Sequence, residues 1–156
     1  MTLEILRMTS ATPQVIELIA ALDDELSAHY PPEQRHSLSL DSLFQSHIHF
    51  MVARDSGNGV GCGGIALFDD FAELKRFYVK PGLRGRGIAD AILAQLSAVA
   101  SAAGHKSLRL ETGTDQHAVL SFYERNGFSR CAAFEPYASL PPHTIATSVF
   151  MEKTLG

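Results

Sequence analysis

The stretch Pro81-Gly82-Leu83-Arg84-Gly85-Arg86-Gly87 separates two segments with different periodicity. Residues 72–79, before it, read as a strand, whereas apolar side chains after it recur at helical spacing from Ile88 until Gly104 ends the run. Residues 107–111 then alternate as another strand. Strand, tight turn, helix and strand form a βαβ unit, which requires two parallel strands and a right-handed crossover. This unit fixes the centre of the fold.

The flanking segments add antiparallel strands and further helices. Turn residues 55–59 between two apolar runs indicate a hairpin, so the sheet is predicted to be mixed. The expected order is β-α-α-β-β-β-α-β-α-β-β, a mixed α/β fold with a central sheet of about 6–7 strands and about four helices. The expected strands are residues 3–8, 48–54, 60–68, 72–79, 107–111, 128–134 and 144–152. The expected helices start at Pro13, at Ser39 or Asp41, at Ile88, and after a cap at Thr114 or Asp115.

Two details of the predicted sheet concern its packing. Ala72 and Leu74 share one parity while Phe77 and Val79 share the other, so we expect a β-bulge near residues 75–76. Residues 61–66 satisfy Gly-x-Gly-x-x-Ala, a dinucleotide fingerprint, but no helix follows them. We interpret these glycines as close packing within the sheet or as a bulge.

Composition excludes several classes of protein. The chain has 156 residues, 46% of them hydrophobic, which fits one folded domain over residues 1–156. A net charge of −4 argues against nucleic-acid binding, and no apolar run approaches the roughly 18–20 residues that span a bilayer. The start lacks a signal peptide, so we expect a cytoplasmic protein that binds no membrane. His47-x-His49 lacks a third ligand, and Cys62 and Cys131 form no zinc pattern, so no metal is expected.

Positive charge gathers around the glycine-containing turn. Five of the 13 basic residues lie in positions 75–86, which hold no acidic residue, and the rest of the chain has 8 basic and 17 acidic residues, a net −9. A turn before a helix N-terminus offers free N–H groups and a positive dipole, so it suits a phosphate. The alternative is a solvated charged turn. A Walker A sequence is absent, and Asp90 occupies the position where a dinucleotide fingerprint requires Gly or Ala.

Residues Arg84-Gly85-Arg86-Gly87-Ile88-Ala89 resemble the acetyl-CoA pyrophosphate loop of the GNAT superfamily of N-acetyltransferases. Residues 73–79 resemble that family's central strand, and residues 110–113 and 122–128 are similar to its second cofactor segment. The resemblance covers roughly residues 60–134. It implies a GNAT-like fold and transfer of the acetyl group of acetyl-CoA to a primary amine by direct attack in a ternary complex.

The resemblance also implies roles for individual residues. In this family the central strand diverges from its parallel neighbour after a bulge, and this leaves a slot for the pantetheine arm. Backbone groups of Phe77, Tyr78 and Val79 are expected to line that slot. Tyr123 is the expected proton donor to the leaving thiolate, and Glu73 is the expected base, acting through water. Glu111 is an alternative base, although an ion pair with Arg109 or a lysine would explain it equally well. Solvent is a further alternative. The pyrophosphate is expected on the six residues Arg84, Gly85, Arg86, Gly87, Ile88 and Ala89.

The acceptor amine is expected to enter opposite the CoA, between the loop of residues 30–37 and that of residues 135–143. Glu33 would attract a cationic amine. The predicted acceptor contacts are Tyr30, Glu33, His36, Glu111 and Tyr137. Small amines and protein amino groups both remain open as acceptors, and a homodimer is possible. Two rival hypotheses are a non-catalytic CoA-binding module and a binder of nucleic acid or anionic surfaces through residues 75–86.

Overall fold

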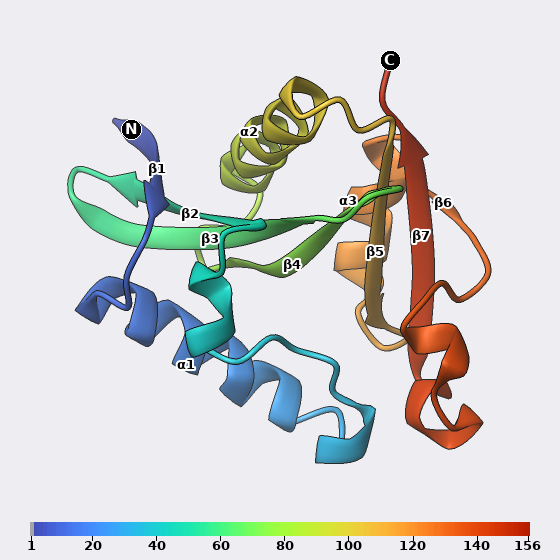
Figure 1. Cartoon of the computed structure of the whole chain (residues 1–156). Coiled ribbons are helices and arrows are strands. Elements are labelled where there is room, and N and C mark those ends of the chain that lie inside the picture. The colour runs from blue at the N-terminus through green and yellow to red at the C-terminus, as the bar shows by residue number, and fades with distance from the viewer. Residues whose placement is uncertain (1) are drawn as a thin grey trace.

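The computed structural model describes residues 2–156 and contains one seven-stranded mixed sheet. The strand order across the sheet is β1-β2-β3-β4-β5-β7-β6, and only β4 and β5 pair in parallel. Figure 1 shows α1 and α2 on opposite faces of the sheet. The strands are β1 (Leu3–Met8), β2 (Ile48–Asp55), β3 (Asn58–Leu67), β4 (Ala72–Val79), β5 (Ser107–Gly113), β6 (Ser129–Arg130) and β7 (Ser148–Thr154). The α-helices are α1 (Pro13–Ser27), α2 (Ile88–Ala102) and α3 (His117–Arg125).

The predicted βαβ unit is confirmed as β4, α2 and β5, and its two strands separate early. They pair only at Ala72 with Leu108 and at Glu73 with Arg109, and no further pair follows Glu73. After Glu73, the green strand β4 therefore runs away from the olive strand β5, and a gap opens in the middle of the sheet (Figure 1). A gap between adjacent parallel strands leaves their backbone groups free to bind a ligand.

The predicted β-bulge is also confirmed. Cys62 of β3 pairs with Tyr78 of β4, but Gly64 pairs with Lys75, so two residues of β4 face one residue of β3. Arg76 lies at the bulge with φ 54°, a left-handed conformation that is uncommon for a residue other than glycine. The family resemblance implied that the two strands separate after the bulge. Pairing with β5 already ends at Glu73, so they separate before it.

Two cores cover the two faces of the sheet. The larger core joins α2 and α3 to the sheet, and the smaller one joins α1 to β2 and β3. The glycines of β3 allow α2 to pack closely on the sheet in the larger core. A Cβ atom on Gly63 would lie 3.0 Å from Phe77 and 3.1 Å from Ile92 of α2. Close packing is thus the role of the Gly-x-Gly-x-x-Ala segment, as predicted.

Several predicted elements need correction. The described residues hold three α-helices rather than about four, because residues 41–44 form only a four-residue 3-10 turn. The strand predicted over residues 128–134 is reduced to β6, and the last strand starts at Ser148 rather than at residue 144. Between them, Phe134 and Tyr137 pack on Phe150 in a third apolar cluster, and two 3-10 turns, Tyr137–Ser139 and Pro142–Ile145, replace extended backbone.

The termini of the helices follow the sequence in one case and depart from it in another. The Thr12 side chain caps α1 by accepting a hydrogen bond from the Val15 N–H at 3.3 Å. Neither predicted residue caps α3, whose N-cap is Gln116 without a side-chain bond. The N–H groups of Thr114 and Asp115 instead bond Thr147 and Tyr30. In residues 2–156, no helix has the length and apolar character needed to cross a bilayer.

Candidate active site

A cleft of about 570 Å³ extends along the gap between β4 and β5. Its walls come from α1, the loop of residues 30–38, β4, the glycine-containing turn, the start of α2, β5 and α3. The turn forms one end, which we call the donor end, and the 30–38 loop with Tyr137 forms the other, which we call the acceptor end. The cleft contains 14 of the 16 side chains or backbone positions that the sequence singles out, since only Glu33 and Arg86 do not line it.

The donor end presents backbone rather than side chains. Gly82, Gly85 and Gly87 all have φ between 81° and 85°, and a Cβ atom on any of them would find open space. Gly87 is the N-cap of α2 and offers no side-chain acceptor, so the first N–H groups of the helix are left for a ligand. This geometry suits an anion at the helix N-terminus.

Ion pairs within the chain engage most of the basic side chains near the turn. Acidic residues of α1 neutralise three of them, and Glu73 neutralises a fourth. The ion pairs are Lys75–Glu73 at 2.9 Å, Arg76–Asp23 at 2.6 Å, Lys80–Glu17 at 3.4 Å and Arg84–Glu25 at 3.0 Å. Arg84 also donates through Nε to the Val79 carbonyl at 2.8 Å. Arg86 is exposed and has no ion-pair partner among residues 2–156, so its charge, unlike that of the other four, is not neutralised within the described part of the chain.

Aromatic side chains form the middle of the cleft. Tyr123 on α3 packs edge to face on Phe77 of β4, with ring centroids 6.1 Å apart, and is 4% exposed. Burial raises the pKa of the Tyr123 hydroxyl well above its ordinary value of 10.0. The hydroxyl therefore keeps its proton at neutral pH.

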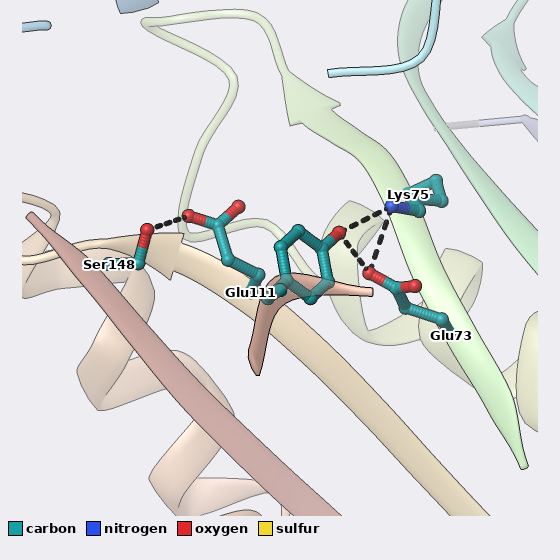
Figure 2. Close-up of polar contacts among 5 residues, drawn as sticks. Glu73, Lys75, Glu111 and Ser148 are labelled. Carbon is teal, nitrogen blue, oxygen red and sulfur yellow. Dashed lines mark hydrogen bonds and ion pairs between the residues drawn. The ribbon is translucent and has the colours of Figure 1, made fainter. Parts of the chain in front are cut away.

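The acceptor end contains a closed triangle of polar side chains (Figure 2). The Tyr137 hydroxyl donates to Glu73 Oε2 at 2.6 Å and accepts from Lys75 Nζ at 2.6 Å, while Lys75 lies 2.9 Å from the same carboxylate oxygen. Glu73 is 1% exposed, and burial together with the Glu73 charge raises the pKa of Tyr137. These contacts join β4 to the 3-10 turn that carries Tyr137, and they use only Oε2 of Glu73.

Glu111, at the end of β5, has a different environment. Its Oε2 accepts a hydrogen bond from the Ser148 hydroxyl at 2.7 Å, and Figure 2 shows the second oxygen pointing away from Ser148. Burial raises the pKa of Glu111 above its ordinary 4.5, and Glu73 adds to the rise, whereas Ser148, His36 and Lys75 oppose it. The ion pair with Arg109 that the sequence left open does not form, because Arg109 lies 3.8 Å from Glu152 instead.

The loop of residues 30–38 closes over the acceptor end. Tyr30 is 5% exposed, lies against Gly113 and accepts a hydrogen bond from the Asp115 N–H at 3.1 Å. Gln34 Nε2 donates to the His143 carbonyl at 3.0 Å, and His36 Nε2 lies 2.6 Å from the Thr144 carbonyl. The two loops that were expected to flank an open entrance are thus bonded to each other. Glu33 is exposed on this loop and outside the cleft.

Sequence reasoning missed three residues of the acceptor end. Lys75 was assigned to the basic turn, although its separation of two positions from Glu73 places both on one face of the strand and was a usable signal. Ser148 and Gln34 gave no such signal, since their partners are 37 and 109 residues away.

Residues 2–156 hold no group of three His, Cys, Asp or Glu side chains arranged to bind a metal. Cys62 is fully buried, and burial raises the pKa of its thiol to about 12, so it is not a thiolate at neutral pH.

Comparisons with known proteins agree with this geometry. The sequence model described as the Acetyltransferase (GNAT) family matches residues 16–128. A protein named IAA acetyltransferase from Azospirillum brasilense is 41% identical over 143 residues, which are 90% of each chain. Among solved structures, a candidate acyl-CoA N-acyltransferase from Klebsiella pneumoniae is 35% identical, with a TM-score of 0.78 over 99% of each chain. The PaiA N-acetyltransferase of Thermoplasma acidophilum, solved in complex with coenzyme A, shares the fold with a TM-score of 0.77 at 22% identity, over 99% of this chain and 100% of the other.

Proposed function

Because this chain belongs to the GNAT family of acetyltransferases, we propose that it transfers the acetyl group of acetyl-CoA to a primary amine while both are bound. The observation that carries the proposal is one continuous cleft, with an anion-binding backbone at the donor end and ionisable side chains at the acceptor end. One sheet that contains strands from Leu3 to Thr154 supports a single transferase domain over residues 1–156.

The donor end supports binding of CoA through backbone groups. The N–H groups from Arg84 to Ala89 would hold the pyrophosphate, as the helix N-terminus favours. The backbone of Phe77, Tyr78 and Val79, which does not pair with β5, would contact the pantetheine arm, and the Val79 N–H would polarise the thioester carbonyl. Arg84, bonded to Glu25 and to the Val79 carbonyl, orders the turn rather than holding phosphate.

Tyr123 is the proposed general acid, which gives its hydroxyl proton to the leaving thiolate. Its burial keeps that proton in place until the carbon–sulfur bond breaks. The assignment of Glu73 as a base stays a prediction. Its carboxylate is engaged by Tyr137 and Lys75, and its Oε1 is buried without a partner in residues 2–156, which favours a positioning role.

The first test is thermal unfolding with acetyl-CoA, CoA and, as controls, NAD and ATP. Selective stabilisation by the two CoA species is expected, by about 2.7 kcal/mol at a concentration 100 times the Kd. Release of free thiol is then followed with a panel of amines, to which IAA is added because the Azospirillum relative is named for it. No stabilisation at millimolar acetyl-CoA would contradict the proposal. Stabilisation without thiol release from any acceptor would favour a non-catalytic CoA-binding module.

A further inference from the structure

We propose that Arg35 binds an anionic group of the acceptor, a carboxylate or a phosphate, so that the favoured acceptors are primary amines that also carry a negative charge. This inference rests on the proposed function and narrows it, because the sequence leaves the charge of the acceptor open. Three observations carry it: Arg35 has no ion-pair partner within residues 2–156, the loop on both sides of it is anchored, and Glu33 lies outside the cleft.

Arg35 is a basic side chain of the acceptor end that forms no ion pair within residues 2–156. It lies on the 30–38 loop, lines the cleft and is half-buried. Among the other basic side chains along the cleft, Lys75, Arg76 and Arg84 pair with carboxylates. Arg125, which also lacks an ion pair in this part of the chain, is exposed at the end of α3. Arg35 therefore supplies a positive charge at the acceptor end that is available to a ligand.

The guanidinium group of Arg35 has unused hydrogen-bond donors. Its Nε is buried and has no partner among residues 2–156. The two Nη atoms are not among the buried atoms that lack a partner, so a ligand is able to reach them. A carboxylate or a phosphate accepts two parallel, charge-assisted hydrogen bonds from such a planar group. An anion on the Nη atoms would give this side chain the partner that the described part of the chain does not supply.

The loop is held in place on both sides of Arg35. Gln34 Nε2 donates to the His143 carbonyl at 3.0 Å, and His36 Nε2 lies 2.6 Å from the Thr144 carbonyl. These contacts anchor the loop without using the Arg35 side chain. Because the backbone that carries Arg35 is already ordered, less conformational entropy is lost when a ligand binds to it.

The charges of the 30–38 loop are arranged differently from the sequence expectation. The sequence predicted that Glu33 would attract a cationic amine, but Glu33 is exposed and does not line the cleft. Arg35, two positions later, does line it, so the loop presents positive rather than negative charge to an acceptor. The cleft also contains the carboxylates of Glu73 and Glu111. The acceptor end thus offers groups of both signs, which complements a molecule with an amine and an anionic group.

The test compares acceptors that differ in charge. Acetyl transfer is followed by thiol release with α- and ω-amino acids and their uncharged carboxamides, and with aminoalkyl phosphates and the matching amino alcohols. We expect kcat/KM for at least one anionic amine to exceed that for its uncharged counterpart by about 10–100-fold. The pairs that show this preference distinguish a carboxylate from a phosphate. Equal or faster transfer to the uncharged member of every pair would overturn the inference and leave the proposed function intact, whereas no transfer to any acceptor would remove both.

The variant Arg35→Gln tests the guanidinium group itself. We expect the KM for the favoured anionic amine to rise about 10–100-fold, with no comparable change for its uncharged counterpart. The Kd for acetyl-CoA should stay unchanged, because Arg35 lies at the acceptor end. Arg35→Lys keeps the positive charge without the planar group and should recover part of the preference.

Arg130→Gln is the matched control, since Arg130 is exposed on β6 and does not line the cleft. It removes the same charge from the molecule and should leave the preference for the anionic amine unchanged. An equal preference in Arg35→Gln and Arg130→Gln would overturn the role of Arg35. A lower melting temperature of Arg35→Gln would not obscure this result, because a partly unfolded preparation loses activity toward both members of a pair alike.

Discussion

The donor end of the cleft is one run of consecutive residues that presents backbone groups, whereas the acceptor end joins side chains from five distant segments. At the donor end the ion pair Arg84–Glu25 is substantially exposed, with 49% and 31% of the two side chains accessible. At the acceptor end Lys75 and Glu73 are 13% and 1% accessible. The same kind of contact therefore carries different energies at the two ends.

The largest expected effect comes from breaking the buried pair. Glu73→Gln leaves Lys75 without a compensating charge, and we expect the free energy of unfolding in urea to fall by about 3 kcal/mol or more. Glu25→Gln, which breaks the exposed pair of the donor end, should cost at most about 1 kcal/mol.

The double variant Glu73→Gln with Lys75→Met controls for the loss of packing. Because it removes the unpaired charge, it should recover most of the stability lost in Glu73→Gln. Equal losses in Glu73→Gln and Glu25→Gln would show that the two ends do not differ as the burial implies.

Tyr123→Phe tests the chemistry that joins the two ends. Removal of the hydroxyl should lower kcat by about 10²-fold, in the usual range for general acid catalysis, with little change in the Kd for acetyl-CoA. Both quantities are measured on the same preparation, by thiol release and by the ligand-dependent melting temperature. Unchanged turnover would remove the assignment of Tyr123 as the acid.

Gly87→Ala tests the backbone character of the donor end. Gly87 has φ 83°, and a side chain in this region costs about 1–2 kcal/mol. We also expect the Kd for acetyl-CoA to rise about tenfold or more, because a methyl group would occupy the surface where the pyrophosphate approaches the backbone.

Gly104→Ala is the matched control, since Gly104 follows the other end of α2 with φ 86° and equally open surroundings. It should cost similar stability without changing the Kd. Equal Kd values for the two variants would contradict an anion site at Gly87.

The donor end was predictable because its signals are local. The glycines of the turn, the helical spacing after Ile88 and the change of parity between Leu74 and Phe77 all lie within about one turn or strand of the feature that they predict. These patterns gave the βαβ unit and the bulge. They also gave the family, through the match at Arg84 to Ala89.

The acceptor end was not predictable in the same way, because its contacts join distant residues. Glu73 and Tyr137 are 64 residues apart, and their hydrogen bond depends on the loop after β6 leaving the sheet to pack on Phe150. The sequence named Glu73, Glu111 and Tyr137 as site residues but gave no indication that Tyr137 and Lys75 both contact Oε2 of Glu73. The hydrogen bonds from Gln34 to His143 and from His36 to Thr144 were not predictable for the same reason.

Gln34→Ala tests whether the hydrogen bonds of the 30–38 loop limit access to the acceptor end. Loss of its bonds to His143 and Thr147 should cost about 0.5–1.5 kcal/mol and raise kcat/KM for pentapeptide acceptors several-fold, while small amines are little affected. Hydrogen exchange of the 30–38 loop should accelerate in parallel. Gln45→Ala is the control, because Gln45 is exposed and its side chain bonds only Ser42 of its own turn. Equal peptide turnover in Gln34→Ala and Gln45→Ala would show that these hydrogen bonds of the 30–38 loop do not limit access.

The smallest expected effect is the pH dependence that Glu111 contributes to stability. Its pKa is raised in the folded state, so the folded protein keeps the proton at pH values where the unfolded chain has lost it. The contribution is complete below the unfolded pKa of about 4.5 and is lost as pH rises through the folded pKa. Urea unfolding between pH 4 and pH 8 should thus show Glu111→Gln gaining stability relative to the wild type as pH rises, and then levelling off. The other ionisable groups around the cleft are present in both proteins, and Glu4→Gln, at an exposed position of β1, controls for net charge. A difference that shrinks as pH rises would mean that Ser148, His36 and Lys75 together outweigh the burial of this carboxylate.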